Sequence, residues 1–135
     1  MGTFSEKFYS DIFRLGAAWN LGVGLGNLTF FKTSMRLFFG KEAMTDNSAA
    51  TLPLRFFYIA IAIFGWGYYM VSRDLTKNRG IIFMGMASKV IIFGFFAYYF
   101  RLKKLKPIAM LAACIDLAFT YLFGLAACDT VKNKP

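Results

Sequence analysis

Long apolar stretches separated by short charged ones set the pattern of this chain. Residues 54–71, 80–100 and 107–127 are each close to the ~20 residues that a helix needs to cross the hydrocarbon core of a bilayer. Residues 15–31 are nearly as long but richer in glycine and asparagine. The pattern predicts an all-α fold in which residues 1–135 form a single membrane domain, a four-helix transmembrane bundle of up-down-up-down topology.

Two amphipathic segments flank the first of these spans. Residues 3–14 carry apolar side chains at helical spacing, and Thr3 with Glu6 matches a capping box. They form either an interfacial helix lying on the membrane or the first turns of a longer first helix. Residues 32–39 mix apolar and basic side chains and are followed by Gly40, which predicts a short interfacial helix in the first loop.

One ionisable residue stands in the middle of each of the last two spans. Counted outward from the basic turn at residues 101–106, Lys89 and Asp116 differ in depth by only about 3 Å at ~1.5 Å per residue. A lone charge at the bilayer centre costs roughly 2.5 to 3.5 kcal/mol on insertion scales, so such residues face the bundle interior and pair. The spacing predicts a buried ion pair between Lys89 and Asp116.

Small and polar residues mark the faces of two spans that should pack inward. Asn20, Gly24 and Asn27 share one face of the first span, while Thr120 and Gly124 continue the stripe of Asp116 on the last. Within a membrane, small residues let helix backbones approach, and amides and hydroxyls hydrogen-bond between helices. We expect these residues to line the interior of the bundle.

The second span has two features of its own. Arg55 lies near its start, where its side chain either snorkels to the headgroups or contacts an anion. Near its other end, Trp66-Gly67-Tyr68-Tyr69 is typical of an aromatic belt at the membrane surface.

Composition and charge narrow the class of protein. The 135 residues are 58% hydrophobic and include 17 Phe, which is too apolar for an ordinary soluble domain. The net charge of +9 comes from Lys and Arg between the apolar spans, which favours membrane lipids over nucleic acid as the partner. The chain has no His, so we predict no metal site. Cys114 and Cys128 lie too far apart along one predicted helix to bridge.

A resemblance to a known family begins at residues 67–74 and continues through residues 77–80 to Lys89, Asp116 and Leu117. Over these positions the chain resembles small four-helix bacterial integral membrane proteins that are loosely DoxX-like. The resemblance implies the inner membrane as location and a cytoplasmic Arg73-Asp74 turn. Four spans then put both termini in the cytoplasm, although basic residues are almost equally divided between the two sides. DoxX proteins are associated with quinone-linked sulfur oxidation, but no catalytic signature of that chemistry is present here.

Three functions are compatible with these patterns. The first is a non-catalytic accessory or assembly subunit that docks on a larger membrane complex, with other membrane subunits or a second copy as partners. The second is a small carrier or binder, in which Lys89, Asp116, Asn20 and Asn27 line a cavity for a lipophilic or anionic ligand. The third is a subunit of a quinone-linked membrane oxidoreductase. No cofactor is predicted; a bound lipid, quinone or pigment stays open.

Overall fold

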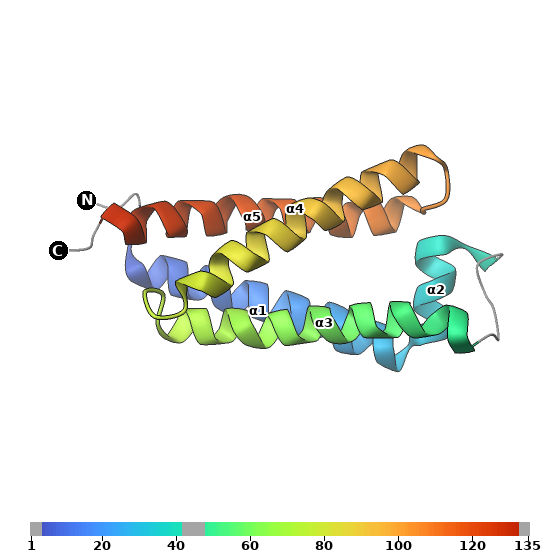
Figure 1. Ribbon diagram of the computed structural model, residues 1–135, viewed down its shortest axis with the longest axis horizontal. Helices are drawn as coiled ribbons and strands as arrows, with labels where there is room; N and C mark the ends of the chain where they lie inside the picture. Colours follow the sequence, from blue (N-terminus) through green and yellow to red (C-terminus); the bar gives the residue numbers. More distant parts are fainter. Residues whose placement is uncertain (1–3, 42–47, 133–135) are drawn as a thin grey trace.

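The computed structural model describes residues 4–41 and 48–132, and over these ranges it is all-α. Its helices are α1 (Glu6–Thr29), α2 (Phe31–Phe39), α3 (Ser48–Arg73), α4 (Arg79–Arg101) and α5 (Pro107–Lys132). The four long helices run side by side, each antiparallel to the long helix before it, and α2 lies crosswise at one end (Figure 1). We call that end the α2 end. The opposite end, where α1 begins and α5 finishes, is the terminal end.

Helix α1 is continuous from its first turn. Ser5 caps it by accepting a hydrogen bond at Oγ from the backbone N–H of Phe8, 3.2 Å away. Tyr9 and Phe13, in the first turns, are fully buried, and the Phe13 ring stacks on Phe123 of α5 with centroids 4.2 Å apart. Of the two interpretations of residues 3–14, a separate interfacial helix is therefore wrong for the described part, and Thr3 lies outside it.

Helices α1 and α3 pack backbone against backbone. A Cβ atom on Gly24 would lie 2.7 Å from both the carbonyl oxygen of Tyr58 and the backbone nitrogen of Ala62. A Cβ atom on Gly65 would come within 2.9 Å of the backbone nitrogen of Leu21. Only glycine permits this approach. Among the described helices, α1 and α3 are the most extensively packed pair.

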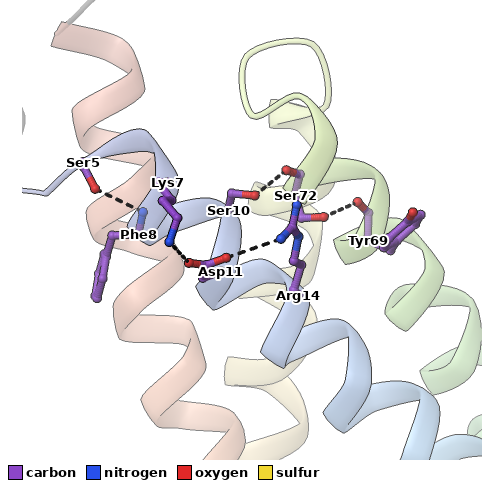
Figure 2. A network of polar contacts seen from close by, with 8 residues as sticks. All are labelled: Ser5, Lys7, Phe8, Ser10, Asp11, Arg14, Tyr69 and Ser72. Carbon is purple, nitrogen blue, oxygen red and sulfur yellow. Dashed lines mark hydrogen bonds and ion pairs between the residues drawn. The ribbon is translucent and has the colours of Figure 1, made fainter.

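A polar network joins the start of α1 to the end of α3 (Figure 2). Ser10 Oγ donates to the carbonyl oxygen of Ser72 at 2.7 Å, and Ser72 Oγ donates to that of Tyr69 at 2.6 Å. Asp11 also pairs with Lys7 and Arg14 along α1, at 3.4 and 3.5 Å. These ion pairs are exposed and add little stability, so the serine bonds carry the contact between the two helices.

Helices α4 and α5 form the second pair, joined by the turn at residues 102–106. Lys103 takes a left-handed conformation in this turn, with φ of 56°. The backbone N–H of Lys106 donates to the carbonyl oxygen of Phe38 at 2.8 Å, which ties the turn to the last residues of α2. The helix predicted at residues 32–39 is thus present as α2, and Gly40 follows it with φ of 93°, a conformation that favours glycine.

Three of the helices, α3, α4 and α5, are long and apolar enough to cross a membrane. The sequence predicted four, and the difference is α1, which does not qualify over its described residues. Arg14 just before the predicted span, the two asparagines and the run of glycines lower the average hydropathy of α1.

The buried core gathers at the terminal end. Its largest fully buried side chains are Tyr68, Phe13, Phe123, Ile82 and Val71. Helix α5 extends beyond the predicted end at residue 127, and Asp129 in its last turns is buried and accepts a hydrogen bond from the Tyr9 hydroxyl at 2.5 Å. The terminal end is therefore filled by side chains, whereas a cavity lies toward the α2 end.

Candidate functional site

Lys89 and Asp116 meet between α4 and α5. Lys89 Nζ forms an ion pair with Asp116 Oδ1 and donates a second hydrogen bond to Asn20 Oδ1 of α1 at 3.1 Å. The Lys89 side chain is only 5% exposed, and that of Asp116 is 27% exposed. The two charges that the sequence placed at equal depth are thus brought together, and Asn20 adds a third helix to the contact.

Asn20 links this ion pair to α3. Its Nδ2 donates to the carbonyl oxygen of Ile61 at 3.3 Å, while its Oδ1 accepts from the Lys89 ammonium. Both ends of the buried amide are therefore occupied, which satisfies the hydrogen-bonding requirement of a group removed from water. The amide holds Lys89 against the α1–α3 pair.

Tyr68 of α3 is the fourth polar residue of this site. It is fully buried, its ring centroid lies 5.6 Å from Lys89 Nζ, and its hydroxyl packs against Gly85 of α4. The hydroxyl has no hydrogen-bond partner within residues 4–41 and 48–132. An unsatisfied buried hydroxyl costs roughly 1 to 3 kcal/mol, which makes Tyr68 a candidate for ligand contact.

The sequence pattern placed Tyr68 in an aromatic belt, and for this residue the prediction is wrong. Its neighbours Trp66 and Tyr69 are 60% and 40% exposed, as belt residues should be, but Tyr68 turns inward. The available signal was helical spacing, because Tyr68 follows Ile61 and Gly65 on the face of α3 that packs toward α1.

A cavity of about 510 Å³ extends from this polar group toward the α2 end. Each long helix contributes apolar wall residues, and Phe38 and Phe39 of α2 line the far end. In chain position, Asn20, Tyr68, Lys89 and Asp116 are at or next to the lining residue of their helix that is nearest the terminal end. The cavity is therefore apolar over most of its length and polar at one end, and its size is in the range of small-molecule sites.

Three other residues predicted to pack inside the bundle are buried or packed against a neighbouring helix, away from this cavity. Asn27 is buried but donates to the carbonyl oxygen of Val23 in its own helix, at 2.6 Å. Thr120 Oγ1 donates to the carbonyl oxygen of Asp116 at 3.0 Å, and Gly124 packs near Met86. None of the three lines the cavity.

Arg55 and the cysteines also lie outside the site. The Arg55 guanidinium lies over the Phe31 ring, 4.1 Å from its centroid, so it links α3 to α2 by a cation–π contact. Cys114 and Cys128 are free and exposed on α5. In the described part of the chain no group of three acidic, cysteine or histidine residues could hold a metal ion.

The polar end of the cavity offers both hydrogen-bond donors and acceptors. Lys89 and Asp116 have a formal charge sum of zero, and the wall around them is apolar. A polar atom at this end of the cavity would find the ammonium and the Tyr68 hydroxyl as donors and the carboxylate as acceptor. Comparison with protein-family models, curated proteins and solved structures finds no match to this chain, so the DoxX-like resemblance stays a prediction.

Proposed function

We propose that this chain is an integral membrane protein that binds one lipophilic molecule in the cavity between its two helix pairs. The observation that carries the proposal is the cavity itself, about 510 Å³ with apolar walls and an ion pair at one end. Ionisable residues inside membrane spans mark ligand pathways and sites. Apolar walls with a few convergent polar groups are the usual composition of small-molecule sites.

The outer surface supports a location within the bilayer. Large apolar side chains are exposed along α3 and α4, far more than a soluble surface carries. They include Phe56, Ile63, Trp66, Met84, Ile91 and Phe95. Lipid acyl chains are the partner that fits this surface.

Helix α1 crosses the bilayer as well in this proposal, as the fourth span. Between residues 15 and 28 its exposed residues are Leu15, Ala18, Gly22 and Leu25, and all of them are apolar or small. The asparagines that lower its average hydropathy are buried against the other helices. Four spans leave both termini on one side, and the DoxX-like resemblance favours the cytoplasmic side of a bacterial inner membrane.

Filling the cavity tests the binding proposal. Ala112 lines the cavity on α5 and is half-buried, whereas Ala118 on the same helix is exposed and lies outside it. Natively purified protein should release a lipophilic compound on solvent extraction, measured by mass spectrometry. Ala112→Phe should lose that compound, and Ala118→Phe should retain it. Equal amounts of the compound in both variants would contradict the proposal.

An accessory subunit is the second candidate, favoured by the outer face of α1. Ala18, Gly22 and Gly26 stand four residues apart, and a Cβ atom on either glycine would meet no other helix of the described chain within 4 Å. Small residues at this spacing form helix interfaces in membranes. Gly22→Ile should then release co-purifying subunits in native gel electrophoresis, and Gly94→Ile, at an equally open glycine of α4, should not.

A further inference from the structure

Two hydrogen-bond donors at the polar end of the cavity have no acceptor. Lys89 Nζ carries three N–H bonds and uses two, toward Asp116 and Asn20. The Tyr68 hydroxyl has no partner in the described ranges. Both residues line the same cavity, so an acceptor group on a ligand there would satisfy donors that the protein leaves open.

The charge of the site selects among acceptors. Lys89 and Asp116 already neutralise each other, and they are the only charged residues among those that line the cavity in the described chain. An anionic head group would add an uncompensated negative charge in low dielectric, beside a carboxylate that is 27% exposed. A neutral acceptor avoids that cost.

We infer that the ligand is a lipophilic molecule with a neutral carbonyl group, which accepts hydrogen bonds from Lys89 and Tyr68. The hydrocarbon part of the ligand extends along the apolar wall toward Phe38 and Phe39. This inference rests on the proposed function, because it assigns the head group of the same ligand.

Three labelled compounds of equal chain length separate the head groups: 2-dodecanone, dodecanoate and dodecane. Equilibrium binding to the detergent-purified protein, stripped of bound lipid, should give a dissociation constant for the ketone about thirtyfold lower than for the alkane, the equivalent of two hydrogen bonds. Dodecanoate should bind no better than the alkane. Dodecanoate binding tighter than the ketone, or equal binding of ketone and alkane, would overturn the inference.

Variants identify the donor. Tyr68→Phe removes only the hydroxyl and should reduce the preference for the ketone about fivefold without changing alkane binding. Tyr69→Phe, at the neighbouring tyrosine outside the cavity, should leave the preference intact. The double variant Lys89→Met with Asp116→Leu keeps the Tyr68 hydroxyl and should also reduce the preference about fivefold, and an unchanged preference there would overturn the role of Lys89.

The cavity-filling variant separates a failure of the proposed function from a failure of the head-group inference. If Ala112→Phe abolishes binding of all three compounds, but the unsubstituted protein binds the ketone no better than the alkane, the proposed function stands and the head-group inference fails. If Ala112→Phe leaves the binding of all three unchanged, the proposed function fails and the head-group inference fails with it.

Discussion

At the scale of single residues, four polar side chains account for the chemistry of this molecule. Asn20, Tyr68, Lys89 and Asp116 come one from each long helix. Only Lys89 and Asp116 carry charge, and the Lys89 ammonium is almost fully removed from water. Among the described residues Asp129 is a further buried charge, and at the terminal end it accepts a hydrogen bond from the Tyr9 hydroxyl.

Removing one charge of the ion pair should cost more than removing both. Asp116→Leu leaves the Lys89 ammonium buried with Asn20 as its hydrogen-bond partner, and we expect a loss of roughly 3 to 5 kcal/mol. Lys89→Met with Asp116→Leu should be milder, because no unpaired charge remains. Reversible unfolding in mixed micelles measures both free energies. A double variant less stable than the single one would contradict this account.

The bond between Tyr9 and Asp129 should also contribute measurably. Tyr9→Phe removes a hydroxyl that donates to a buried carboxylate at 2.5 Å, and we expect a loss of roughly 1.5 to 3 kcal/mol in the same unfolding assay. Tyr121→Phe is the control, since Tyr121 is 69% exposed. Equal stability of the two variants would show that the Tyr9 bond is not needed.

At the scale of the element, α1 has two glycine faces with opposite requirements. Gly24 faces α3, where a Cβ atom would lie 2.7 Å from backbone atoms, and Gly22 faces outward with open space. The same residue type therefore serves close packing at one position and leaves an open surface at the other.

Alanine substitutions should separate these two faces. Gly24→Ala should destabilise the protein by roughly 1 to 3 kcal/mol, because the backbones of α1 and α3 would have to move apart. Gly22→Ala should be neutral or should stabilise α1 by up to ~1 kcal/mol, since alanine is the better helix former. Urea titration of each variant in micelles gives the ratio of folded to unfolded protein, and from it the free energies of unfolding to be compared. A neutral Gly24→Ala would mean that the contact is looser than described.

How far the sequence predicts this fold depends on what each pattern encodes. Depth along a span follows from counting residues, which is why Lys89 and Asp116 could be paired in advance. The direction in which a side chain faces around its helix is encoded more weakly in the sequence. The aromatic pattern therefore predicts Tyr68 at the surface with Trp66 and Tyr69, although Tyr68 is buried. Average hydropathy also cannot distinguish outward from inward polar residues, and this is why α1 is ambiguous.

At the scale of the whole molecule, the number of membrane crossings depends on α1. Helices α3, α4 and α5 are each apolar enough to cross, and α1 runs antiparallel along α3. If α1 crosses too, its start lies on the same side as the turn between α3 and α4. If it does not, its start lies with the turn between α4 and α5.

Cysteine labelling from one side of the membrane decides between these topologies. After Cys114 and Cys128 are replaced by alanine, single cysteines at Ser5, Thr76 and Lys103 report on α1 and the two turns, because all three positions are exposed. We expect Ser5→Cys and Thr76→Cys to react from one side and Lys103→Cys from the other. Reaction of Ser5→Cys together with Lys103→Cys would exclude four crossings.

If the protein lies in the bilayer as proposed, the short turn between α4 and α5 has a consequence for biosynthesis. Lys89 and Asp116 sit at matching distances from residues 102–106, so the two helices can leave the insertion machinery as one hairpin with their charges already joined. Neither charge would then have to enter the hydrocarbon alone. Asn20 is synthesised earlier, on α1. It would accept its hydrogen bond from Lys89 when the α1–α3 pair packs against a hairpin whose two charges are already paired.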